Sequence, residues 1–150
     1  MTTIKFGTDG WRGVIADDYT YENVRKVATA IARYIVRAEK PNAGVIVGYD
    51  TRYSSEHFAR AAAEAVSMTG MPVWLAEKAC PTPSVSLLVR QRGAAGGIMI
   101  TASHNPYKWN GVKFKASYGS SALPSIVAEV EKELQTVLAT GVPQLPAQPA

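Results

Sequence analysis

The alternation of short apolar runs with helical patterns is the feature that most constrains the fold of this chain. Strand and helix patterns follow one another from residue 44 to residue 100, and a further helical pattern lies on either side. Strands joined through helices pair in parallel and need helices on both faces of their sheet. The sequence therefore predicts an α/β fold, a three-layer α/β/α domain with a mostly parallel mixed sheet of about four strands.

Four helices are expected, each with a recognisable start or end. Apolar residues at three- and four-residue spacing predict a helix over residues 21–38, with Thr20 as its N-cap. The other three are expected from Ser54 or Ser55 to about Met68, from an N-cap at Thr82 to Gly93, and from near Pro124. In the third of these four helices, the residues expected to be buried are Val85, Leu87, Leu88 and Val89.

Strands are predicted at 44–49, 72–76, 94–100 and 112–115. Trp74, in the second strand, is expected in the core. Asn110-Gly111 is typical of a hairpin turn, and the strand after it alternates, with Lys113 and Lys115 on one face. Lys108 and Lys115 are interpreted as solvated surface charges.

The composition is that of one globular domain of 150 residues, 47% hydrophobic and 19% charged. A single cysteine, Cys80, excludes an internal disulfide framework. The sequence has no apolar signal core and no run long enough to span a bilayer, so a soluble cytoplasmic protein with no membrane partner is expected. The net charge of +4 favours an anionic partner, and because the basic residues are dispersed, small phosphorylated molecules are favoured over nucleic acid.

The stretch GGIMITASHNP, residues 96–106, combines a buried strand with a polar loop. Ser103 follows the carboxyl end of the strand, where α/β sheets usually place their ligands, and His104 comes directly after it. One residue could carry a transferred group and the next could move a proton. The alternative is a polar turn that ends at Pro106.

A second glycine-rich stretch, FGTDGWRG at residues 6–13, contains Asp9 and Arg12. Backbone N–H groups and a guanidinium fork are suited to binding phosphate. The alternative is a structural turn that contains an internal Asp9–Arg12 pair.

Five motifs in this order, FGTDGWRG, GYDTR, PTPS, TASHNP and NGVKF, resemble the first domain of the α-D-phosphohexomutases over residues 4–140. The resemblance implies a phosphoglucomutase or phosphomannomutase type of enzyme, in which Ser103 carries a phosphoryl group. That group passes to a hexose phosphate, giving a bisphosphorylated sugar that reorients before a phosphate returns to the serine. Arg12 and Lys113 match basic residues near the phosphoserine, and His104 matches a histidine that is a candidate acid/base or substrate-orienting residue.

The resemblance gives the GYDTR loop a supporting role and implies magnesium as cofactor. A structural role is expected for Asp50 and Arg52. The metal would be held by Ser103, through its phosphate, and by aspartates of a DxDxD loop in a second domain. This sequence contains no such triplet, since Asp17-Asp18 is an unrepeated pair, and one serine phosphate cannot define a magnesium site alone.

The resemblance also places this chain as one domain of about four. Residues 1–140 are expected to form the phosphoserine domain, and residues 141–150, rich in proline, a linker or tail toward further domains. The expected partners are hexose phosphates, hexose bisphosphate and the remaining mutase domains, and the chain alone is expected to show little or no turnover.

Two alternatives remain open. TASHNP favours the glucose and mannose branches of the family, whereas the glucosamine-phosphate branch more often has SASHNP. A non-catalytic phosphosugar-binding or assembly module would keep the basic loops without needing the metal-binding aspartates.

Overall fold

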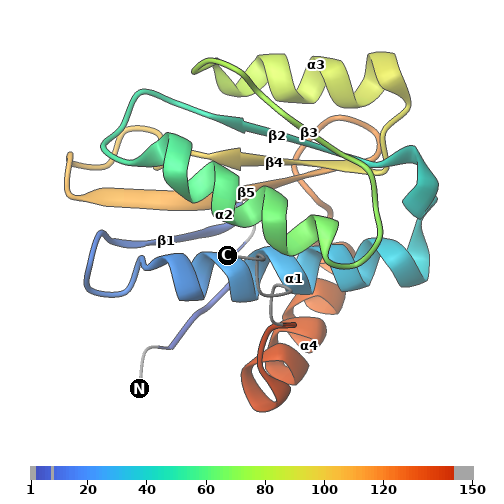
Figure 1. The fold of residues 1–150 in the computed structure, drawn as a ribbon, viewed down its shortest axis with the longest axis horizontal. Coiled ribbons are helices and arrows are strands. Elements are labelled where there is room, and N and C mark those ends of the chain that lie inside the picture. The colour runs from blue at the N-terminus through green and yellow to red at the C-terminus, as the bar shows by residue number, and fades with distance from the viewer. Residues whose placement is uncertain (1–2, 8, 144–150) are drawn as a thin grey trace, which may run out of the picture.

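The computed structural model describes residues 3–7 and 9–143. Within them the chain forms a five-stranded sheet in the order β1-β5-β4-β2-β3, together with four α-helices and one short 3₁₀ helix. The strands are β1 (Trp11–Val14), β2 (Val45–Tyr49), β3 (Val73–Leu75), β4 (Gly96–Ile100) and β5 (Trp109–Ala116). The helices are α1 (Tyr21–Ala38), η1 (Pro41–Ala43), α2 (Ser55–Ser67), α3 (Thr82–Arg92) and α4 (Pro124–Thr140). Figure 1 shows their arrangement.

The predicted fold class is confirmed. β2 pairs in parallel with β3 and β4, and β5 pairs antiparallel with β4 and β1, so the sheet is mixed. The structure adds one strand to the expected four. That strand, β1, begins inside the glycine-rich stretch 6–13 and ends one residue beyond it. The glycines make the alternation of its two buried residues, Trp11 and Gly13, hard to recognise in the sequence. No helix among the described residues is long and apolar enough to cross a membrane.

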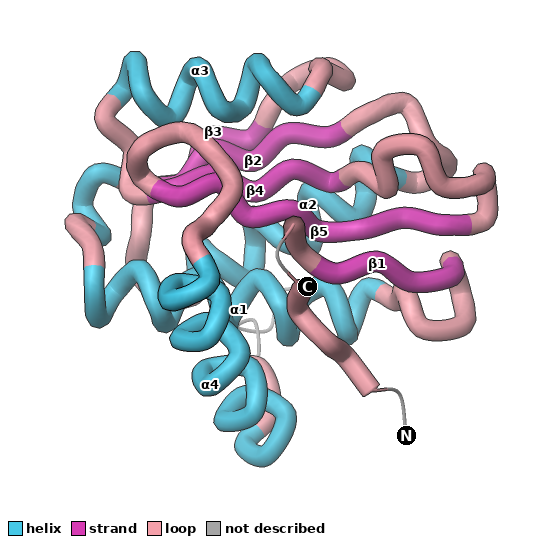
Figure 2. The backbone as a smooth tube through the Cα atoms, turned by 180° about the vertical axis from the view of Figure 1, so that it is seen from behind, coloured by secondary structure: helices cyan, strands magenta, loops and turns pink. Residues whose placement is uncertain are grey.

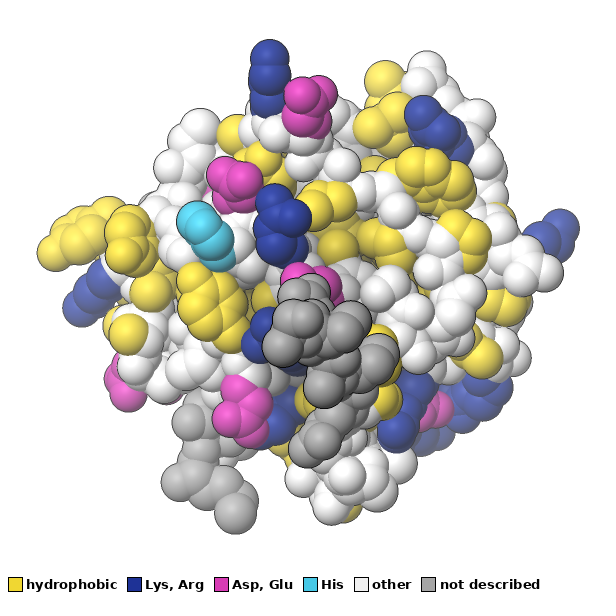
Figure 3. Space-filling view, viewed as in Figure 1, with side chains coloured by type: hydrophobic (Ala, Val, Ile, Leu, Met, Phe, Trp, Pro, Cys, Tyr) yellow, Lys and Arg dark blue, Asp and Glu magenta, His cyan; other side chains and the backbone are white. Residues whose placement is uncertain are grey.

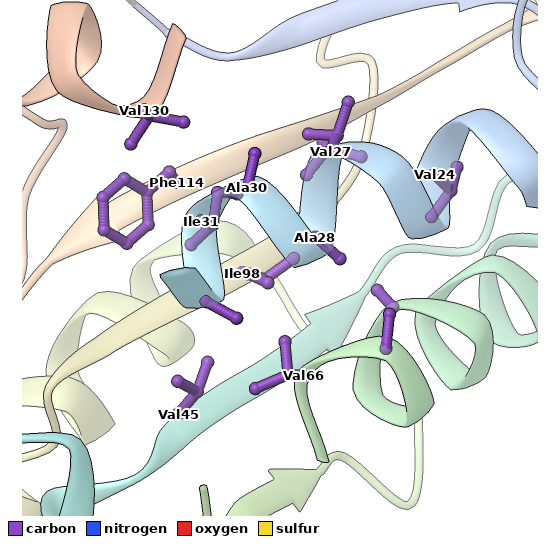
Figure 4. Close-up of a cluster of buried hydrophobic side chains, with 14 of the residues drawn as sticks. Val24, Val27, Ala28, Ala30, Ile31, Val45, Val66, Ile98, Phe114 and Val130 are labelled. Carbon is purple, nitrogen blue, oxygen red and sulfur yellow. The ribbon is translucent and has the colours of Figure 1, made fainter. Parts of the chain in front are cut away.

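One face of the sheet is covered by α1, α2 and α4, which share the main hydrophobic core with it. The α1 helix begins where predicted, because the Thr20 hydroxyl accepts a hydrogen bond from the backbone N–H of Asn23 at 3.2 Å. Each fully buried Val or Ile side chain in this core stabilises the fold by roughly 1.5–3 kcal/mol. Figure 4 shows α1 residues against side chains of the sheet, α2 and α4, labelled as Val24, Val27, Ala28, Ala30, Ile31, Val45, Val66, Ile98, Phe114 and Val130.

The opposite face is covered by α3, which lies mainly over β2 and β4 and makes fewer contacts with β5. Val85 and Val89 of α3 pack there on Ile46 and Met99. The helix approaches closely because the sheet has glycine beneath it: a Cβ on Gly97 would lie 2.8 Å from both valine side chains. In Figure 2, which shows the molecule from behind, no helix lies across β1 or most of β5.

Two predictions about α3, one on its buried residues and one on its first residue, are wrong. Val85 and Val89 are buried, as expected, but Leu87 is 54% exposed and Leu88 is 38% exposed. The helix turns these two leucines away from the sheet. The helix begins one residue earlier than expected, at Thr82, so Thr82 is not its N-cap. Gly93 ends it in the left-handed conformation, as predicted.

Two further predictions about the strands are wrong. Trp74 is 39% exposed because β3 is an edge strand, and its ring lies 5.6 Å from the Arg92 guanidinium. Asn110-Gly111 is not a turn but the interior of β5, facing Arg12 and Gly13 of β1. The Asn110 side chain is fully buried and donates to Ser55 Oγ at 2.9 Å, so tertiary contacts replace the expected local turn.

The side of the molecule that carries α1, α2 and α4 has a mixed surface, in which hydrophobic side chains are interspersed with charged and polar ones (Figure 3). The last helix, α4, begins at Pro124 as predicted and ends at Thr140. The greater part of the expected linker, residues 144–150, lies outside the described residues.

Candidate functional site

Ser103 lies in the loop that follows β4, with its side chain exposed to solvent. Its backbone is left-handed, with φ of +56°, although it is not glycine. Its N–H donates to the Thr101 hydroxyl at 3.0 Å, and the Asn105 N–H donates to the carbonyl of Ala102 at 3.0 Å. A non-glycine residue in this region is strained unless its surroundings hold it there, and such residues concentrate at functional sites.

Arg52 is the residue that holds this loop. Its guanidinium donates to four backbone carbonyls, at distances of 2.7–3.1 Å, which belong to Ser103, Asn105, Pro106 and Trp109. Asp50 fixes Arg52 in turn, since its carboxylate accepts from the Arg52 backbone N–H at 3.0 Å and lies 3.5 Å from Nε. These contacts agree with the structural role expected for the pair. The sequence motif did not reveal that Arg52 reaches three carbonyls of this loop and the carbonyl of Trp109 at the start of β5.

Arg12 of β1 connects the first glycine-rich motif to the same loop. Its Nη1 donates to the Asn105 side-chain oxygen at 3.0 Å, across 93 positions of sequence. Its Nη2 also lies 3.8 Å from the Asp9 carboxylate, so the internal Asp9–Arg12 pair of the structural alternative is present. Asn105, which had no assigned role, is the loop residue that Arg12 contacts directly.

Lys113 of β5 reaches the same cluster from the adjacent strand. Its Nζ lies 2.9 Å from Asp9 Oδ2, and its side chain is only 12% exposed. Burial by itself raises the pKa of Asp9, but the hydrogen bond and charge of Lys113, with smaller contributions from Lys115 and Ser121, bring that pKa below its usual value. Asp9 is therefore an ionised counter-ion at neutral pH, contacted by both predicted basic residues.

Lys115 was expected on the solvated surface, and the structure contradicts this. It is 7% exposed, and its Nζ donates to the Ser121 hydroxyl at 3.3 Å. Burial lowers its pKa, Asp9 acts in the opposite direction, and Lys113 lowers it further. The turn that follows β5 covers this lysine, and a sequence pattern local to β5 could not reveal that cover. Lys108 is exposed, as expected.

His104 is exposed beside Ser103 and makes no side-chain hydrogen bond or ion pair in the described part of the chain. The structure thus brings Arg12 to the Ser103 loop and joins Arg12 to Lys113 through Asp9. Within the described residues, the Ser103 hydroxyl makes no hydrogen bond to Arg12, Lys113 or Asp9. The roles assigned to Ser103, His104, Arg12 and Lys113 remain predictions.

A shallow depression of 330 Å³ adjoins this cluster, lined by Lys5, Gly7, Asp9, Gly10 and Arg12. Close packing explains the glycine at position 10. Its φ is +99°, and a Cβ there would lie 2.0 Å from the carbonyl oxygen of Val112. The motif's glycine thus lets the first loop lie directly against β5, which places Asp9 beside Lys113.

The side chains of this site cannot bind magnesium by themselves. Across residues 3–7 and 9–143 there is no group of three His, Cys, Asp or Glu side chains that could hold a metal ion. The one carboxylate in the cluster, Asp9, is already paired with cations. Magnesium needs near-octahedral oxygen coordination, which these residues do not provide.

The fold and this cluster define a three-layer α/β domain with a cationic site at one edge of its sheet. The model of the family described as "Phosphoglucomutase/phosphomannomutase, alpha/beta/alpha domain I" matches residues 3–140. The chain therefore belongs to the phosphoglucomutase/phosphomannomutase family, and the matched part is its domain I.

Relatives agree on the family and differ in their names. A phosphoglucosamine mutase from Picosynechococcus is 40% identical over 130 residues, covering 87% of this chain and 27% of the relative. A second, from Shewanella pealeana, is 41% identical over 134 residues, covering 89% and 29%. A crystal structure of a protein assigned as a phosphomannomutase from Thermus thermophilus superposes with a TM-score of 0.81 at 40% identity, covering 87% of this chain and 30% of that one. The chain thus spans less than a third of the length of each.

Proposed function

We propose that this chain is the phosphoserine domain of a phosphohexomutase, in which Ser103 receives and returns the phosphoryl group during interconversion of hexose 1-phosphate and hexose 6-phosphate. The observation that carries the proposal is the hydrogen bond between Arg12 and Asn105. It joins the FGTDGWRG and TASHNP motifs, which are far apart in the sequence, into one cluster. Membership of the phosphoglucomutase/phosphomannomutase family supports the same proposal.

The proposed reaction moves a phosphoryl group between Ser103 and a sugar hydroxyl. A sugar hydroxyl attacks the phosphorus of phosphorylated Ser103, forming a new O–P bond as the bond to Ser103 Oγ breaks. The sugar hydroxyl loses a proton and the serine oxygen gains one. After the bisphosphate reorients, its other phosphate returns to Ser103 by the reverse exchange. Such a transfer depends mainly on positioning and on neutralising charge, for which we propose Arg12 and Lys113.

His104 is the proposed proton carrier or substrate-orienting residue, because it is exposed directly beside Ser103. Magnesium, if the whole enzyme uses it, would neutralise charge on the transferred group. The described residues do not supply its ligands, so further ligands would have to come from elsewhere. The remaining domains of a mutase are the proposed partners, in a soluble cytoplasmic setting.

The substrate class is a hexose phosphate, with the sugar to be decided by experiment. TASHNP favours glucose or mannose, whereas the names of the curated relatives favour glucosamine. We expect intact-mass analysis to show one added phosphoryl group on the chain after incubation with the 1,6-bisphosphate of the correct sugar. The incubation is done with the chain alone and with a fragment of a relative that lacks its own domain I.

Ser103→Ala should abolish the labelling, whereas Ser120→Ala, on an exposed turn, should leave it unchanged. Labelling that survives Ser103→Ala would contradict the proposed carrier. The bisphosphates of glucose, mannose and glucosamine would all be tested, with and without the fragment of the relative. If they bind but none of them labels Ser103, the non-catalytic binding module is favoured.

A further inference from the structure

Within the described residues, Asp9 is the only carboxylate that forms ion pairs with Arg12 and Lys113, and it contacts side chains from three segments. Its Oδ2 lies 2.9 Å from Lys113 Nζ of β5 and 3.8 Å from Arg12 Nη2 of β1. Its Oδ1 accepts from the Ser121 hydroxyl at 3.2 Å, and that hydroxyl also accepts from Lys115 Nζ at 3.3 Å. The carboxylate thus connects β1, β5 and the turn after β5.

The charges around Asp9 do not balance. Arg12 and Lys113 have no other acidic partner in the described part of the chain, and Lys115 reaches Asp9 only through the Ser121 hydroxyl, so three cations surround one carboxylate. A phosphate at this cluster would need the same donors that Asp9 occupies: the ammonium of Lys113 and the guanidinium of Arg12. Asp9 is 43% exposed on its side chain, so it can move aside without breaking the core.

We propose that Asp9 competes with phosphate for Arg12 and Lys113. It holds these two side chains in position when no phosphate is bound, and it lowers the affinity of the site for phosphate. Asp9 is thus a positioning residue that acts through Arg12 and Lys113. The proposal rests on the proposed function, because a serine that must both receive and return a phosphoryl group gains from a site that does not bind phosphate too tightly.

Inorganic phosphate is the probe, titrated into the isotope-labelled chain at constant ionic strength and followed by NMR. Asp9→Asn keeps the size of the side chain and removes its charge, and we expect it to bind phosphate about five-fold more tightly, the size typical of one partly exposed charge. Glu131→Gln is the matched control, because it makes the same charge change on α4, across the sheet. Its affinity should stay at the wild-type value, and Asp9→Glu, which keeps the charge, should stay close to it.

Phosphate binding that is unchanged or weaker in a folded Asp9→Asn chain would overturn the proposal. The wild-type chain gives a second test in case that variant does not fold. Saturating phosphate should shift the Lys113 Nζ and Asp9 carboxyl resonances together, as the ion pair between them opens. Resonances that stay in place, or a phosphate that does not bind near them, would also overturn it.

This test separates the two proposals. If Ser103 is not labelled by any bisphosphate but Asp9→Asn binds phosphate more tightly, the competitor role stands at an anion-binding site and the transfer function fails. If Ser103 is labelled and Asp9→Asn binds phosphate no more tightly, the transfer function stands and the competitor role fails.

Discussion

Strand β5 sends Val112 and Phe114 to one face of the sheet and Lys113 and Lys115 to the other. The first face lies under α1, α2 and α4, and Val112 and Phe114 are buried there in the main core. On the second face α3 covers β2 and β4, and the side chains toward β1 are charged. The period-two alternation of one strand thus separates a face that supplies stability from a face that supplies charge.

The first prediction compares adjacent residues of β4 that point to opposite faces. Ile98→Ala removes a fully buried side chain from the main core, and we expect it to lower the free energy of unfolding by about 4 kcal/mol. Met99→Ala, in the smaller cluster under α3, should lower it by about 2.5 kcal/mol, because a smaller cluster collapses more easily around the cavity. Urea unfolding measures both. Equal losses would remove the energetic difference between the faces.

The second prediction concerns the Arg52 contacts at the edge of the sheet. Arg52→Gln removes hydrogen bonds to four backbone carbonyls and should lower the free energy of unfolding by about 3 kcal/mol. Arg60→Gln, on the exposed part of α2, should change it by less than about 0.5 kcal/mol. Amide exchange should also become faster at Asn105 and Trp109 in Arg52→Gln alone. Slow exchange there would mean that the loop holds its shape without Arg52.

The third and smallest effect has the opposite sign. Lys115 is buried on the charged face, and an apolar side chain of similar length carries no charge to desolvate, so Lys115→Met should raise the free energy of unfolding by about 1 kcal/mol at pH 7. The pKa of Lys115 lies below its ordinary 10.5, so between the two values the unfolded chain binds more protons and wild-type stability should rise with pH. Chemical denaturation from pH 7 to 10 should show this rise in the wild type and its loss in Lys115→Met. A destabilised variant would mean that the contacts of Lys115 outweigh its burial.

Helices were predicted more accurately than strands, for a physical reason visible in particular residues. The start of α1 follows from the local hydrogen bond between Thr20 and Asn23, and both residues lie in one short stretch of sequence. The central place of Asn110 in β5 depends on Ser55, which is 55 positions away, so the local turn signal was misleading. β1 likewise exists only through its pairing with β5.

The candidate site shows the same division. The motifs pointed to Ser103, Arg12 and Lys113, and the structure places Arg12 and Lys113 on one carboxylate. The central position of Asp9 and the burial of Lys115 depend on the turn that contains Ser121, which carries no motif of its own. Sequence patterns locate the chemical groups, whereas contacts between distant segments determine which of them meet.

The four carbonyls held by Arg52 bear on how the proposed partners, a further domain or a sugar phosphate, would meet this surface. Because the loop around Ser103 is already fixed, its conformational entropy is lost when the domain folds and not when a ligand arrives. An encounter then requires only that the incoming molecule be oriented, which favours fast association and leaves more of the contact energy available for binding.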